Sequence, residues 1–192
     1  MALLTRDDLR RHKAMTWVCL ALLAAVAAAL WLTDRRGAAM GTLAALAGCL
    51  GLVLPPRERM AALPARLRRL PRSFDAAPIM ATLLSIPGFG LNWFYGANPY
   101  DEVVHFVSGI LAGAVFGGLM MTDGRTRARS RLGWLGLVFG LALGVSWEAF
   151  EWAIAIIGGW TDTWTDIALT TLGSGIGAAF TRQPAPRREA AA

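Results

Sequence analysis

Long apolar stretches alternate with short polar segments along the chain. Residues 14–33 and 37–54 carry no charge, and each is about long enough to cross a bilayer as a helix, which takes about 20 residues. Four more predominantly apolar stretches follow, at 76–95, 101–122, 132–157 and 165–180. Because a helix satisfies its own backbone hydrogen bonds in lipid, this pattern predicts an all-α fold, a polytopic transmembrane bundle of six spans.

Proline and glycine mark several ends of these stretches. Pro55-Pro56 ends the second span because proline cannot continue a helix, and the sequence Pro87-Gly88-Phe89-Gly90 is expected to kink or break the third. A loop is expected at 158–164. A cleaved signal peptide is the rival interpretation of 14–33, but its apolar region would be too long.

The same pattern divides the chain into three parts. Residues 1–75 are predicted to form a two-span hairpin with a basic loop, residues 76–181 a four-span core, and residues 182–192 a disordered polar tail. Both cysteines, Cys19 and Cys49, fall inside apolar segments, so we expect them to pack in the core rather than to form disulfides.

Composition agrees with a membrane protein. Of the 192 residues, 55% are hydrophobic, and the mean hydropathy of +0.46 is too high for an ordinary soluble domain. The net charge of +6 does not indicate nucleic-acid binding, because the basic residues form clusters between apolar runs instead of following one face.

The basic residues also predict the orientation in the membrane. Of the 19 Lys and Arg residues, four lie before the first span, six after the second, four after the fourth and three in the tail. Only Arg35 and Arg36 fall on the opposite side. The positive-inside rule therefore predicts that both termini are cytoplasmic. Residues 55–73 are expected to lie along the headgroups of the cytoplasmic leaflet.

Acidic residues gather at the predicted outer ends of the last three spans. Together with one histidine they are Asp101, Glu102, His105, Glu148, Glu151, Asp162 and Asp166. Glycines spaced by four precede or follow them on each span, as in Gly109, Gly113 and Gly117. Such oblique glycine rows permit close helix crossing, so we expect these spans to pack on their glycines and to turn the acids toward one another.

These acids have no basic partner on their own helices. Lys and Arg are absent from 74–123 and from 133–180. Three remedies remain open: some carboxyl groups hold protons, Arg35 and Arg36 reach over from the first loop, or a divalent cation binds. Carboxylates with one imidazole suit Zn²⁺, Mn²⁺ or Fe²⁺, and Mg²⁺ or Ca²⁺ if the imidazole stays away from the ion. The predicted ligands are Asp101, His105, Glu148, Glu151, Asp162 and Asp166.

Simpler roles compete with a functional one. Asp101 and His105 are spaced for a local hydrogen bond, Asp162 and Asp166 for helix capping, and Glu102 for contact with headgroups. His12, in the basic N-terminal segment, is expected to be solvated. We interpret His105, Glu148 and Glu151 as the candidate catalytic residues, because ionisable groups at membrane depth are usually functional.

At these residues the chain resembles a known family. The pattern Tyr100-Asp101-x-x-x-His105-Phe106, Glu148-x-x-Glu151-Trp152 and Asp162-Thr163-x-x-Asp166 with Gly173 is similar to the YjdF-like bacterial inner-membrane proteins and, more distantly, to VanZ-like proteins. The resemblance covers 76–180 and implies a multi-pass protein of the bacterial inner membrane. Such relatives often carry Asn four residues after the last Asp, where this chain has Thr170.

Three functions fit the pattern. The first is an enzyme or a binding site for a lipid or another polar headgroup at the outer leaflet, with a divalent cation or the acids orienting the ligand. The second is a proton- or cation-coupled transporter, favoured by intramembrane carboxylates but without an inverted repeat. The third is a structural or assembly protein in which the polar residues fix helix register.

Overall fold

The computed structural model describes residues 4–95, 97–154 and 159–181, and within these ranges the regular structure is entirely helical. The tail at 182–192, predicted to be disordered, lies outside the described residues. The elements in chain order are α1 (Arg6–Arg10), α2 (Ala14–Leu32), α3 (Arg36–Val53), η1 (Arg57–Arg59), α4 (Ala65–Arg69), η2 (Arg72–Phe74), α5 (Ala76–Gly90), η3 (Trp93–Tyr95), α6 (Tyr100–Met120), α7 (Arg129–Ala153) and α8 (Trp160–Phe180).

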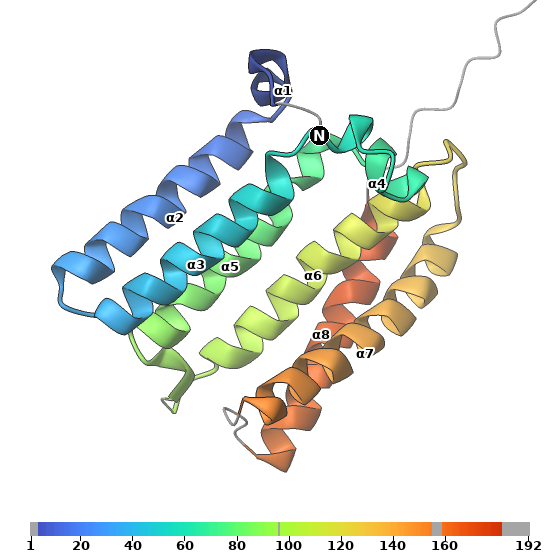
Figure 1. Cartoon of the computed structure of the whole chain (residues 1–192). Coiled ribbons are helices and arrows are strands. Elements are labelled where there is room, and N and C mark those ends of the chain that lie inside the picture. The colour runs from blue at the N-terminus through green and yellow to red at the C-terminus, as the bar shows by residue number, and fades with distance from the viewer. Residues whose placement is uncertain (1–3, 96, 155–158, 182–192) are drawn as a thin grey trace, which may run out of the picture.

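Four of the described helices, α2, α3, α6 and α7, are long and apolar enough to cross a membrane. The shorter α5 and the more polar α8 run alongside them in the same bundle (Figure 1). Helices begin and end within about four residues of the predicted bounds, except at α5, which ends at Gly90 instead of 95, and at α8. That helix begins at Trp160 instead of 165, so the expected loop at 158–164 is wrong beyond Gly159.

The early start of α8 has a local cause. Thr163 N–H donates to Gly159 O at 2.9 Å, which closes the first helical turn. An acid in this turn, Asp162, is favourable next to the positive end of the helix dipole. The polar character of residues 160–164 reflects their position at a helix end, and it was misread as a loop signal.

Helix α5 passes through Pro87 and ends three residues later. Pro87 lies inside the helix, and Leu91 N–H donates to Pro87 O at 2.9 Å just past its last turn. The chain then reverses at Asn92, which has a φ of 61°. Phe94 packs back over Gly88, where any side chain would collide with its ring. The predicted break therefore falls at the last residue of this motif, Gly90.

Two kinds of packing hold the bundle together. Large apolar side chains, including Leu23, Val53 and Ile79, form a buried core between α2, α3 and α5. Both cysteines are free and buried in this core, as expected. In contrast, α8 packs closely on α6 and α7 through small residues, and α5 joins the two groups by packing on α6 as well.

Glycine makes the second kind of packing possible. A Cβ atom added at Gly109 would lie 2.7 Å from Thr170 O, and one added at Gly136 would lie 2.6 Å from Ser174 O. Both distances are too short for a real side chain, so these helices approach one another through their backbones. Ser174 Oγ donates across the interface to Gly109 O at 3.1 Å. The predicted glycine-mediated packing is confirmed.

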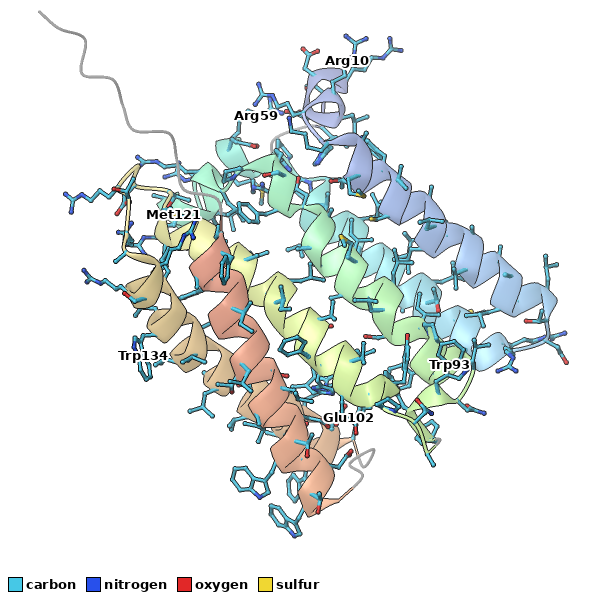
Figure 2. The ribbon with its side chains drawn as sticks, turned by 180° about the vertical axis from the view of Figure 1, so that it is seen from behind. Arg10, Arg59, Trp93, Glu102, Met121 and Trp134 are labelled. Atoms are coloured by element: carbon cyan, nitrogen blue, oxygen red, sulfur yellow. The ribbon has the colours of Figure 1, made fainter. Side chains whose placement is uncertain are left out.

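The bundle has two chemically distinct ends. The basic end holds α1, η1, α4, η2 and the α6–α7 connection, and the acidic end holds the α2–α3 turn, η3 and the starts of α6 and α8 (Figure 1). In Figure 2 the labelled Arg10 and Arg59 lie at the first end and Glu102 lies at the second.

His12 at the basic end is buried, contrary to the prediction that it is solvated. Only 6% of the residue is exposed, and its Nδ1 lies 3.0 Å from Asp75 Oδ2. Asp75 also accepts hydrogen bonds from Arg57 and, at 3.5 Å, from Arg72. Arg72 further donates to Glu58 at 2.7 Å and to Val53 O at 2.9 Å.

This cluster corrects the placement expected for part of the basic segment. Arg57 and Arg72 point inward and connect the ends of α2, α3 and α5, instead of facing lipid headgroups. Burial acts to lower the pKa of the Arg72 guanidinium, but Glu58 and Asp75 outweigh it, so the pKa is raised and the charge is retained. The inward turn follows from the acids, because a buried carboxylate requires a partner.

Candidate functional site

A pocket of about 380 Å³ opens at the acidic end of the bundle. It lies between α5 on one side and α7 on the other, with α6 and α8 contributing the remaining wall. The lining residues are Ala81, Thr82, Ser85 and Phe89 of α5; Phe94 and Tyr95 of η3; Asp101, Val104, His105, Ser108, Gly109 and Ala112 of α6; Leu143, Trp147 and Glu151 of α7; and Asp162 and Thr170 of α8.

Three of the predicted ligands converge in this region. One side-chain atom each from Asp101, His105 and Asp166 lies within 4.8 Å of the other two. His105 Nε2 is 3.6 Å from Asp101 Oδ1 and 3.8 Å from Asp166 Oδ2. These separations are too long for hydrogen bonds. The three groups therefore surround a common point, with His105 within ion-pair distance of both carboxylates and hydrogen-bonded to neither.

The spacing suits a small cation. Two ligands that each lie about 2.0–2.1 Å from Zn²⁺ can be at most about 4.2 Å apart. The two separations from His105 Nε2 fall within this limit. The two carboxylates, whose ligand atoms lie within 4.8 Å of each other, would have to move closer together to share one ion with the imidazole. Asp101 and His105 come from one turn of α6, and Asp166 comes from α8.

A hydrogen bond from the other side of the ring orients His105. Its Nδ1 lies 3.3 Å from Thr170 Oγ1, one turn along α8 from Asp166. If Nδ1 carries the proton and donates to the threonine, Nε2 presents a lone pair toward the two carboxylates. This tautomer is the one that a metal ligand requires.

The two glutamates of α7 have different surroundings. Glu151 lines the pocket, and its Oε1 accepts a hydrogen bond of 2.8 Å from Trp147 Nε1. Glu148 points toward α8 and is only 5% exposed, and within the described residues its Oε1 has no hydrogen-bond partner. Thr163 Oγ1 on α8 is buried next to the Glu148 carboxyl group, and in the described structure it has no other partner.

The remaining acids lie toward the rim. Asp162 is exposed at the start of α8 and lines the pocket, while Glu102 is exposed on the far side of α6 and does not. Asp101 is close enough to Asp162, Glu102 and Glu148 for their charges to interact. The structure thus brings the predicted carboxyl groups to one region, with Glu102, which was assigned to the headgroups, outside the pocket lining.

Arg35 and Arg36 do not supply the missing positive charge. Arg35 donates to Gly90 O at the end of α5, and Arg36 pairs with Asp34 at 2.9 Å. In the described part of the chain, the ion pairs of these carboxyl groups involve His105 alone. Three ways of compensating the carboxylate charges were considered. The prediction that Arg35 and Arg36 reach them is wrong, so bound protons or a divalent cation remain.

Sequence reasoning missed two residues of this site. Thr170 was noted only as a departure from the family pattern, yet its hydroxyl contacts the histidine ring. Trp147 was given no role at the site, although it holds Glu151. The four-residue spacing of Trp147 and Glu151, and of Asp166 and Thr170, places each pair on one helix face and was the available signal.

Comparison with known proteins gives one family. The description "Predicted membrane protein (DUF2238)" belongs to the family that matches residues 14–183, which include every described membrane-length helix and the whole pocket. No curated protein and no solved structure matches the chain. Since the match extends over most of the sequence, the chain belongs to the DUF2238 family of predicted membrane proteins.

Proposed function

We propose that this membrane protein holds a divalent cation between Asp101, His105 and Asp166, and binds or acts on a polar headgroup there. The main support is that two carboxylates and an oriented imidazole converge from two helices. Among the described residues, no basic side chain lies beside them. A divalent cation would neutralise the carboxylates and polarise a phosphate or carbonyl oxygen of the ligand.

The proposal includes a topology. Six spans with both termini in the cytoplasm would place the basic end inside and the pocket near the outer face of a bacterial inner membrane. The division of Lys and Arg between the two sides supports this orientation. The narrower resemblance to YjdF-like and VanZ-like proteins fits the same placement and stays a prediction.

The two glutamates have proposed roles in this scheme. Glu151, which faces the pocket, would take or deliver a proton at the ligand. Glu148, buried behind it, would hold a proton of its own or accept one from a neighbour. Asp162, at the rim, would attract the cation or the ligand to the pocket.

Metal content tests this proposal. The full chain is purified in an uncharged detergent without chelators, and metal per chain is measured by plasma mass spectrometry. We expect about one divalent ion per chain in the wild type and in Glu102→Gln, whose acid lies outside the pocket. His105→Ala and Asp166→Asn should each lose the ion. Absence of metal from the wild type, or its retention in both ligand variants, would refute the metal site.

One observation supports a second candidate, a proton- or cation-coupled transporter. Glu148 is buried on a membrane helix with an unpartnered oxygen in the described structure, which is the environment of a carboxyl group that exchanges protons. In proteoliposomes, Glu148→Gln should then abolish a proton flux that Glu102→Gln leaves intact. A wild-type flux no greater than that of empty liposomes would remove this candidate.

A further inference from the structure

We propose that the pocket takes an amphiphile with an ammonium headgroup, bound by Glu151 and Trp147, and an alkyl chain that enters between α5 and α7. The inference rests on the proposed function, because it uses the same pocket as a ligand site. It goes further by assigning the headgroup charge, the direction of the chain and the residues that select them.

The pocket changes character along its length. On α6 it runs from Asp101 to Ala112, about 16 Å at the helical rise of 1.5 Å per residue. Acids line it at the Asp101 end, whereas Ala81, Ala112 and Leu143 line it toward the middle of the bundle. A ligand that satisfies both ends must carry a polar group and an apolar chain, with the chain directed toward the bilayer centre.

The shape of the pocket limits how the chain enters. Helices α5 and α7 form its two sides, with α6 between them, and the large apolar residues on the outer surface of α7, such as Val138 and Leu141, are exposed where lipid would surround the bundle. A volume of about 380 Å³ is at the lower end of the range for small-molecule sites. It accommodates a headgroup and part of one chain, but not a whole two-chain lipid.

The charge of the lining selects the headgroup. Asp101, Glu151 and Asp162 line the pocket, and His105 is the only lining residue able to carry a positive charge. One divalent ion at the histidine cluster leaves the carboxylate of Glu151 without a cationic partner. An anionic headgroup would be repelled there, whereas an ammonium group would be attracted.

Aromatic side chains complete an ammonium site at the same place. Trp147 fixes Glu151 by donating to its Oε1 at 2.8 Å, which leaves Oε2 for a ligand. The rings of Trp147 and Tyr95 both line the pocket. Carboxylates combined with aromatic faces are the usual environment of a bound ammonium group.

Three probes, two single-chain lysolipids and one headgroup without a chain, test the inference with the full-length protein in an uncharged detergent. Lysophosphatidylethanolamine carries the ammonium and the chain, lysophosphatidylglycerol of the same chain length lacks the ammonium, and glycerophosphoethanolamine lacks the chain. Dissociation constants are measured by native mass spectrometry. We expect the first probe to bind at least tenfold more tightly than either of the others. Equal affinity for the two lysolipids would overturn the headgroup assignment, and equal affinity with and without the chain would overturn the amphiphile.

Variants assign the residues. Glu151→Gln should weaken binding of lysophosphatidylethanolamine about tenfold and leave the affinity for lysophosphatidylglycerol unchanged. The matched control Glu102→Gln should change neither affinity. Ala112→Leu, which fills the deep end of the pocket, should weaken the binding of both lysolipids. If this variant does not fold, Ala81→Leu fills the same end of the pocket from α5 and makes the same test. Equal losses in Glu151→Gln and Glu102→Gln would show that only bulk charge matters.

The metal assay separates this inference from the proposed function. Glu151→Gln should keep the ion of the wild type while losing the preference for ammonium. A wild type without metal that still prefers the ammonium lysolipid would refute the metal site alone. A wild type with metal that binds the lysolipids equally would refute the ammonium site alone.

Discussion

Replacing Gly109 by alanine should disturb both the packing of α8 and the geometry of the histidine cluster. The new Cβ atom would lie 2.7 Å from Thr170 O, and an ordinary contact begins at 3.4 Å. The obstacle is backbone, so α6 and α8 must separate by about 0.7 Å at this level. Overpacking of this kind costs about 1–3 kcal/mol.

The displacement acts on the site through Thr170. Its Oγ1 lies 3.3 Å from His105 Nδ1, near the limit of a hydrogen bond. A separation of about 0.7 Å along this direction would break the bond and free the imidazole ring to rotate. Loss of such an orienting partner weakens metal affinity about 10–100-fold in known sites, and we expect Gly109→Ala to fall in this range.

The matched control is Gly41→Ala on α3, where an added Cβ meets nothing within 4 Å. Both substitutions replace a glycine inside a helix, so the gain in helix propensity cancels in the comparison. Thermal unfolding in detergent gives the stability difference, and metal titration of the two variants gives the affinity difference. If Gly109→Ala matches Gly41→Ala in both measurements, the close approach of α6 and α8 does not set the site.

Further predictions concern the basic end and the pocket wall. Asp75→Asn should destabilise the fold by about 3–5 kcal/mol, because it leaves buried cationic partners uncompensated, whereas Asp34→Asn at an exposed pair should have little effect in the same denaturation assay. Burial acts to raise the pKa of Glu58, but its hydrogen bond with Arg72 and the nearby charges outweigh it and hold the pKa below the ordinary 4.5. A depressed carboxyl pKa contributes stability above the unfolded value and loses it as the pH falls through the folded one, so unfolding midpoints should drop below about pH 4.5 and drop less in Glu58→Gln. Tyr100→Phe should cost about 1 kcal/mol in thermal unfolding, because the hydroxyl donates to Leu84 O at 2.5 Å.

Hydropathy and proline positions predicted the helices well because both act locally. An apolar run of membrane length favours a helix, and a Pro-Pro pair ends one, whatever the helix packs against. The exceptions were local as well. Residues 160–164 are polar enough to resemble a loop, but their position next to Gly159 makes them the first turn of α8.

Pairings between distant segments were harder to predict. His12 and Asp75 are 63 residues apart, and His105 and Thr170 are 65 apart. Periodicity within a helix indicates the face on which a residue lies, but not the residue that faces it. His12 was therefore assigned to solvent, because nothing in its own segment indicates that it faces Asp75.

The acids of α7 show how finely direction matters. Glu148 and Glu151 are three positions apart and were predicted as one group. The structure turns Glu148 into the α7–α8 interface, continuing the row of Gly140 and Gly144, and leaves Glu151 in the pocket beside Trp147. Residues three apart on a helix differ in direction by about 60°, which is enough here for one acid to meet α8 and the other to meet the pocket.

This geometry connects packing with chemistry. The glycine rows that bring α6 and α8 together end in His105 and Asp166, so the distance between the helices also fixes the distance between the candidate ligands. A site built from side chains on two helices is only as well defined as the crossing that holds them. Backbone contact through glycine sets that crossing more rigidly than long side chains could, because a backbone atom cannot change rotamer. The cost is a pair of helices with little large-side-chain packing of their own, and α5 compensates by joining them to the apolar core of α2 and α3.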